Sequence, residues 1–204
     1  MVVAAGYFLF QLNSDNYNNM QRIQAIDPAT QTGIKKELFD KVQNNIGTVP
    51  NLARTLGNST AALQGYLSFR GALHESSIGD KLSEMIALTV SNANGSAYCN
   101  ALHTYMGIHT AGLDDTDIKL ARIGKAIDLK LQAALAFSRT ILEKKGKVAD
   151  TDINFIRNAG FNDAAIVEII ACTALNVFTN YLNNAAATVV DFPKTEMDAN
   201  ALIV

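Results

Sequence analysis

Apolar residues recur every three to four positions along most of this chain, the spacing of one face of an α-helix. No segment alternates apolar and polar residues over the length of a strand, and Pro50 is the only proline between Pro28 and Pro193. The pattern predicts helices in the segments 34–47, 60–75, 80–93, 96–109, 114–127, 129–145, 150–160 and 162–190. The predicted fold class is therefore all-α.

The two ends of the chain lack this periodicity. Residues 1–32 are rich in Asn, Gln and Asp, so we expect an N-terminal arm at 1–36, a helical domain at 37–195 and a C-terminal tail at 196–204. The first ten residues are apolar, but no Lys or Arg precedes Arg22, so the arm lacks the basic start of a secretory signal. We expect the arm to pack on a neighbouring subunit, with a lipophilic leader as the alternative.

Two of the predicted helices resemble each other. The segments 84–93 (EMIALTVSNA) and 168–177 (EIIACTALNV) agree at five of ten positions with an offset of 84 residues. This agreement predicts a duplicated helical unit, although two alanine-rich buried helices can also match by chance. The second copy lacks the cysteine and histidine that follow the first, so thiol chemistry is expected in the first half only.

Composition limits the partners and the compartment. Hydrophobic residues make up 49% of the chain and charged residues 18%, so we expect extensive burial, part of it between subunits. The net charge of −2 gives no basic surface for nucleic acid. We identify no apolar run of about 20 residues that would cross a membrane. Two cysteines do not make a disulfide framework, which favours the cytoplasm.

The candidate chemistry lies in the segment 94–104 (NGSAYCNALHT). Asn94 and Gly95 form a strong turn signal, and Ser96 after them is a good N-cap. Cys99 then falls in the first turn, where free backbone N–H groups favour a thiolate, and His103 lies one turn later on the same face. This pattern predicts either an activated thiol or a small buried cysteine beside a core histidine.

Glu84 favours the first of these alternatives. It lies in a segment otherwise crowded with Leu, Met, Ile, Ala and Val, where a carboxylate is costly without a partner. If this helix packs beside the next one, Glu84 can orient the imidazole of His103 and complete a proton relay to Cys99. The alternative is a glutamate on an exposed strip.

The spacing of these residues resembles that of the AhpD-like alkylhydroperoxidases, within the carboxymuconolactone decarboxylase superfamily. Their pattern Glu-x11-Cys-x2-Cys-x3-His reads here as Glu84, Ser96, Cys99 and His103. The segments 38–76 and 178–193 also resemble the longer, peroxidase-related members. The resemblance implies an AhpD-like helical bundle that forms dimers, trimers or hexamers. It assigns Cys99 as the nucleophile that attacks a hydroperoxide, with His103 and Glu84 as the relay, and it implies no cofactor.

Ser96 occupies the position of the family's resolving cysteine, a role that a serine cannot perform. Attack by Cys99 would still give a sulfenic acid. Cys172, at the position that matches Leu88 in the repeat, is expected to be a buried structural cysteine. Three outcomes remain for the oxidised Cys99: reduction by an external thiol or dithiol, a cycle that uses one cysteine, or no turnover.

Two other functions compete with the peroxidase. An acid–base enzyme of the decarboxylase type would use His103 and Glu84 without the thiol, and a non-catalytic oligomer would keep only the fold. Weaker candidate residues, expected to be mainly structural, are His74, His109, Tyr98, Asn180, Tyr181, Asn183 and Asn184. No metal-binding spacing and no Gly-rich phosphate loop occurs in the sequence.

Overall fold

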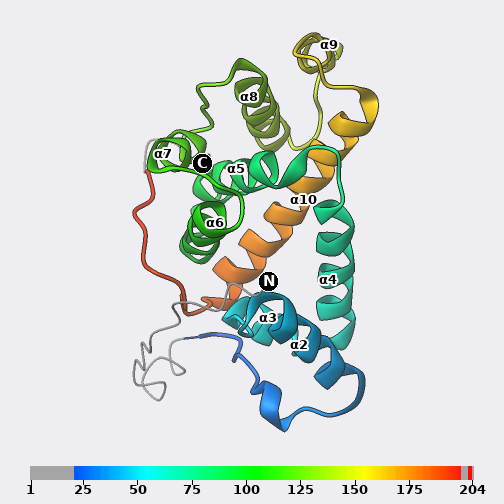
Figure 1. Ribbon diagram of the computed structural model, residues 1–204, viewed down its shortest axis with the longest axis vertical. Coiled ribbons are helices and arrows are strands. Elements are labelled where there is room, and N and C mark those ends of the chain that lie inside the picture. Colours follow the sequence, from blue (N-terminus) through cyan, green and yellow to red (C-terminus); the bar gives the residue numbers. More distant parts are fainter. Residues whose placement is uncertain (1–20, 199–201, 204) are drawn as a thin grey trace.

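The computed structural model describes residues 21–198, 202 and 203, and the regular structure of these residues is entirely helical (Figure 1). After a short 3-10 helix, η2 (Pro28–Thr30), the helices are α2 (Gly33–Ile46), α3 (Asn51–Leu56), α4 (Thr60–His74), α5 (Gly79–Ala93), α6 (Ala97–His109), α7 (Asp115–Arg122), α8 (Leu129–Glu143), α9 (Asp150–Asn158) and α10 (Asp163–Ala186). The all-α prediction is confirmed.

Side-chain caps explain where several helices begin. The Ser59 hydroxyl accepts the Ala62 N–H at 3.2 Å at the start of α4, and the Asn162 side chain accepts the Ala165 N–H at 2.9 Å at the start of α10. Asp114 and Asp128 cap α7 and α8 in the same way. These local signals are why the sequence pattern placed most helix starts within a residue or two.

Helices α5 and α10 form the centre of the molecule and cross in Figure 1. Every residue of α5 from Met85 to Ala93 is buried. One hydrophobic cluster joins α5 and α7–α9 to the first half of α10, and a second joins α2, α3 and α4 to the start of α6. The α5–α6 corner therefore lies between two cores, which fixes it in place.

Helix α10 is long and apolar enough to cross a membrane by length and composition, with a mean hydropathy of 1.5 over its best window. By that criterion the expectation that the chain has no such segment is wrong. Half of this window is buried inside the protein, since α10 packs against α5 and α8. In this fold α10 is thus a core helix of the bundle.

Helix α3 was not predicted, because its start is capped by a residue far away in the sequence. The Asp191 carboxylate accepts the Asn51 N–H at 2.7 Å and the Tyr98 hydroxyl proton at 2.8 Å. Burial, and then the charge of Asp191, raises the pKa of Tyr98, so this phenol stays a donor. The segment after α10 therefore ties α3 to the start of α6.

Helix α7 is shorter than predicted, because the chain turns at Ile123 and Gly124, where Gly124 has a φ of +70°.

Residues 21–27 pack against other segments of the same chain. The Arg22 N–H donates to the Ala186 carbonyl at 2.8 Å, and the Gln21 amide donates to Thr55 at 3.0 Å. The proposed contact of the N-terminal arm with a neighbour concerns residues 1–20, which lie outside the described residues.

Candidate functional site

The turn between α5 and α6 positions Cys99. Gly95 adopts a φ of +63°, which favours glycine, and α6 begins two residues later at Ala97. Cys99 is thus the third residue of α6, in the first turn, as predicted. The free N–H groups of this turn place partial positive charge near the thiol.

Ser96 occupies the N-cap position of α6, but its side chain forms no cap. Its ψ is 95°, outside the 114–176° of the N-cap residues whose side chains cap α4, α7, α8 and α10. The prediction of a capping hydroxyl is therefore wrong. The Ser96 Oγ is buried and has no hydrogen-bond partner in the described part of the chain.

Glu84 on α5 and His103 on α6 lie in contact, with 2.8 Å between Oε2 and Nδ1. Each side chain is 16% exposed, so the pair is shielded but still reaches solvent. The carboxylate fixes the imidazole ring and leaves its Nε2 available for proton transfer. Glu84 is therefore a partnered carboxylate rather than one on an exposed strip.

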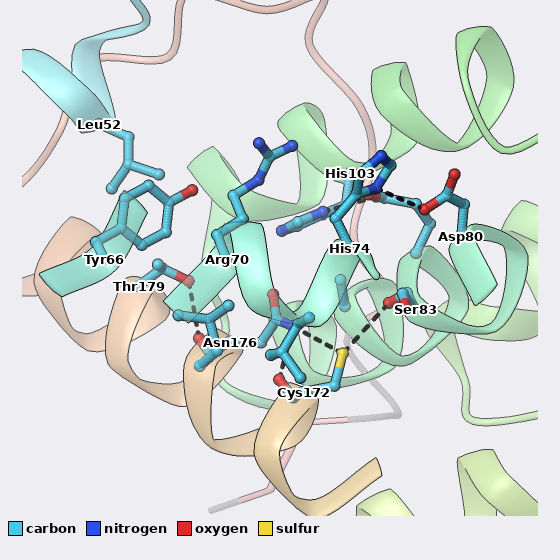
Figure 2. A pocket seen from close by; sticks show the side chains of 14 residues that line it. Leu52, Tyr66, Arg70, His74, Asp80, Ser83, His103, Cys172, Asn176 and Thr179 are labelled. Atoms are coloured by element: carbon cyan, nitrogen blue, oxygen red, sulfur yellow. Dashed lines mark hydrogen bonds and ion pairs between the residues drawn. The ribbon is translucent and has the colours of Figure 1, made fainter. Parts of the chain in front are cut away.

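A cavity of about 80 Å³ opens beside this pair (Figure 2). Tyr66 and Arg70 from α4 share its wall with Glu84 and His103, and the rest of the wall is made of both apolar and polar side chains, including His74 and Asp80. A smaller hollow of about 40 Å³ touches the same four polar side chains. Among the residues that the structure describes, no carboxylate forms an ion pair with Arg70. The cavity thus combines an acid–base pair, a phenol and a cation.

Cys99 lies behind this wall rather than in it. Its side chain is 0% exposed and belongs to the second hydrophobic cluster, and the Asn183 amide donates to its Sγ at 3.1 Å. No hydrogen bond joins Cys99 to His103 within residues 21–198. Tyr66 packs against the hydrophobic cluster that contains Cys99 and also lines the cavity, so it contacts both.

The electrostatics of Tyr66 agree with this position. Burial raises the pKa of its phenol, and negative charge on Cys99 or Glu84 raises it further, while Arg70 lowers it. The phenol of Tyr66 therefore lies within electrostatic range of both the Cys99 thiol and the Glu84 carboxylate. Sequence reasoning missed Tyr66 and Arg70, although their i, i+4 spacing on one helix face was available as a signal.

Cys172 is buried, as expected, but it lines the cavity. Its Sγ lies 3.8 Å from the Ser83 carbonyl oxygen and 3.7 Å from the Asn176 amide nitrogen (Figure 2). Burial, and then the charge of Glu84, raises its pKa to about 12. The thiol that is nearest to the cavity is therefore held in its unreactive, protonated form.

This pKa predicts slow alkylation of Cys172. At pH 8 its reaction with iodoacetamide should be on the order of a thousandfold slower than that of a free cysteine, because almost no thiolate is present. The rate should rise about tenfold with each pH unit up to the pKa, since the thiolate fraction rises in proportion. Peptide mass spectrometry of timed samples measures this, and fast labelling near neutral pH would contradict it.

The remaining candidates have structural contacts. His74 pairs with Asp80 at 2.9 Å at the cavity edge, and the ring of His109 packs on that of Tyr105. Tyr181 is exposed on α10. The asparagines of α10 link that helix to the α5–α6 corner: Asn180 contacts Ser91 and Asn94, and Asn184 donates to the Asn94 carbonyl at 3.0 Å. The described residues contain no cluster of His, Cys, Asp and Glu that could hold a metal ion.

Comparison with known proteins finds a family that part of the chain resembles. Residues 60–143 match the carboxymuconolactone decarboxylase family. That segment contains α4–α8, and with them Glu84, Ser96, Cys99 and His103. No curated protein sequence matches the chain.

Solved structures share the fold at low identity. An uncharacterized peroxidase-related protein from Ralstonia eutropha JMP134, with an alkylhydroperoxidase AhpD core, aligns with a TM-score of 0.76 and 22% identity over 84% of this chain and 93% of that chain. A peroxidase-related protein from Silicibacter sp. TM1040 aligns with a TM-score of 0.70 and 22% identity over 87% and 93% of the two chains. The debrominase Bmp8 in complex with 2,3,4-tribromopyrrole aligns with a TM-score of 0.64 and 20% identity over 80% and 85%.

Proposed function

We propose that the chain belongs to the carboxymuconolactone decarboxylase family, whose model matches residues 60–143, and that this protein with an AhpD-like fold is a cytoplasmic, thiol-dependent peroxidase. The observation that carries the proposal is the Glu84–His103 contact of 2.8 Å, one helical turn from a thiol in the first turn of α6. A fixed imidazole beside a helix-terminal cysteine is a common way to activate a thiol.

The reaction proceeds by attack of the Cys99 thiolate on the terminal oxygen of a hydroperoxide. The S–O bond forms as the O–O bond breaks, the sulfur loses two electrons, and the leaving alkoxide takes a proton. His103 supplies this proton, and Glu84 stabilises the imidazolium that forms before proton transfer. Side chains that bury Cys99 must move aside for the peroxide to reach the sulfur, since Cys99 is 0% exposed.

Reduction of the oxidised sulfur requires a thiol from outside the chain. Cys172 is the only other cysteine, and it lies 11 residues before Asn183, the residue of α10 that contacts Cys99. This separation is about 16 Å along the helix axis, too far for a disulfide. The reductant is therefore a small thiol or a dithiol partner.

This mechanism predicts one turnover per chain when no thiol is present. Hydrogen peroxide or an organic hydroperoxide added in excess should be consumed in a burst of about one equivalent, because the oxidised Cys99 is not regenerated. A peroxide electrode or dye assay measures the burst. Cys172→Ser should keep the burst and Cys99→Ser should lose it; an equal burst in both variants would rule out Cys99 as the nucleophile.

We also propose that the protein is a homo-oligomer that associates through the outer face of α10. Val167, Ile170, Phe178 and Tyr181 lie at helical spacing on that face and are 64%, 38%, 43% and 62% exposed. A continuous apolar strip of this kind is typical of an interaction surface rather than of scattered surface residues.

Substitution of this strip should separate the subunits. Phe178→Glu combined with Tyr181→Glu should give a monomer by light scattering, with an unchanged helical circular dichroism spectrum, because two buried charges oppose association. Phe155→Glu on α9, where the phenylalanine is 54% exposed, is the matched control and should leave the mass unchanged. A double variant with the mass of the wild type would exclude this face.

One observation favours a second function. The cavity contacts Glu84, His103 and Arg70 but not Cys99, an arrangement suited to acid–base chemistry on a small acidic carbonyl compound, as in a decarboxylase. Under that function Cys99→Ala keeps full activity on such a substrate and His103→Gln loses it. The peroxide burst and its dependence on Cys99 separate the two functions.

A further inference from the structure

Two buried polar atoms near Cys99 have no hydrogen-bond partner among the described residues. They are the Oγ of Ser96, whose residue is 0% exposed, and the Oδ1 of Asn183, whose residue is 3% exposed. Buried polar groups are nearly always paired, so each of these atoms is able to take a further hydrogen-bond partner. Asn183 donates to the Cys99 Sγ through its amide nitrogen, and Ser96 precedes Cys99 by three residues at the start of α6.

The contacts define where the missing group would lie. Asn183 holds Cys99 Sγ at 3.1 Å through Nδ2, and the unpaired Oδ1 is the other end of the same planar amide. Ser96 precedes Cys99 by three residues at the N-cap of the same helix, so the two residues lie within one helical turn of each other. The sulfur thus has one donor and one free acceptor on Asn183, and a buried hydroxyl one turn away on Ser96.

We propose that Ser96 and Asn183 bind the oxygen of a Cys99 sulfenic acid, and that this oxidised cysteine is a long-lived state of the protein. This inference rests on the proposed function, because the sulfenic acid is the product of Cys99 attack on a hydroperoxide. A thiolate and ROOH take up one proton through His103 to give Cys99–SOH and ROH. The new S–OH donates to Asn183 Oδ1, and its oxygen accepts from the Ser96 hydroxyl.

The surroundings slow the usual reactions of a sulfenic acid. Condensation with a second thiol is blocked within the chain, since Cys172 is far along α10 and Ser96 stands where a resolving cysteine would stand. Cys99 is fully buried, so a second peroxide and a bulky thiol have poor access. Ser96 therefore preserves the oxidised state that a cysteine at the same position would remove, and the state is reset only by a small external thiol.

The test is the lifetime of Cys99–SOH in the full-length protein. After one equivalent of hydrogen peroxide and removal of the excess, timed samples are trapped with dimedone and the Cys99 peptide is quantified. The wild type should lose the adduct at least about ten times more slowly than Ser96→Ala or Asn183→Leu, because each variant removes one hydrogen bond to the oxygen.

Controls separate this inference from the proposed function and from loss of fold. Asn184→Ala removes a neighbouring asparagine that contacts Asn94 instead of Cys99, and its adduct should last as long as that of the wild type. Ser96→Ala replaces an unpaired buried hydroxyl with a methyl group, so the reduced variant should be at least as stable as the wild type. Equal lifetimes in the wild type and Ser96→Ala would overturn the inference and leave the peroxidase intact. No adduct at Cys99 would overturn both.

Discussion

Ser96→Cys should turn a protein that reacts once into one that turns over with a dithiol reductant. The substitution places a second thiol three residues before Cys99, across the first turn of α6. The Cα atoms of residues at this spacing lie about 5 Å apart, within the Cα separation of about 4.4–6.8 Å that a disulfide spans. The new thiol should resolve the Cys99 sulfenic acid as a disulfide, which dithiothreitol then reduces.

The expected gain is at least about a hundredfold in steady-state hydroperoxide consumption with dithiothreitol. Ser59→Cys is the matched control, because Ser59 holds the N-cap position of α4 as Ser96 does that of α6, but far from Cys99 in the sequence. It should give no gain. If Ser96→Cys forms no disulfide on oxidation and does not turn over, Cys99 is not the peroxide-reactive thiol.

Glu84→Gln should slow the oxidation of Cys99 by about a hundredfold to a thousandfold. The amide keeps the shape of the side chain but removes the negative charge that stabilises the imidazolium of His103. Proton transfer by a positioned side chain contributes about a hundredfold to ten-thousandfold to a reaction rate, which sets the size of the expected loss. Stopped-flow measurement of the burst phase gives the rate directly. His103→Gln should slow it to a similar extent, because both residues act in one relay.

The chain offers a matched control for this substitution. Glu168 on α10 occupies the position that corresponds to Glu84 in the repeated segment, but it accepts hydrogen bonds from Ser77 on the surface instead of contacting a histidine. Glu168→Gln should leave the burst rate unchanged. A Glu84→Gln variant that reacts as fast as the wild type would show that the Glu84–His103 contact is structural.

Local chemistry made much of the fold predictable from the sequence. The Asn94–Gly95 turn, the Ser59 and Asn162 caps and the apolar faces act within a few residues, so they appear in the sequence pattern. The contact between Glu84 and His103 was also accessible, because an isolated carboxylate among apolar residues requires a partner.

What the sequence did not show depends on contacts between distant segments. Helix α3 is capped by Asp191, which lies 140 residues later, so no local signal marks it. Cys172 lines the cavity only because of how α10 packs against α5, and Tyr66 lines the cavity and contacts the Cys99 cluster only because of how α4 packs. Ser96 has the residue type and position of a cap, but its hydroxyl forms no cap hydrogen bond. The duplication of α5 and α10 and the domain boundaries remain predictions.

The most direct measurement is the location of the oxidised sulfur after one equivalent of peroxide. The protein is treated, labelled with dimedone, digested and analysed by mass spectrometry, with the peptides of Cys99 and Cys172 quantified together. The account predicts the adduct on Cys99 and little or none on Cys172, whose pKa of about 12 keeps it protonated. An adduct confined to Cys172, or none on either cysteine, would contradict it.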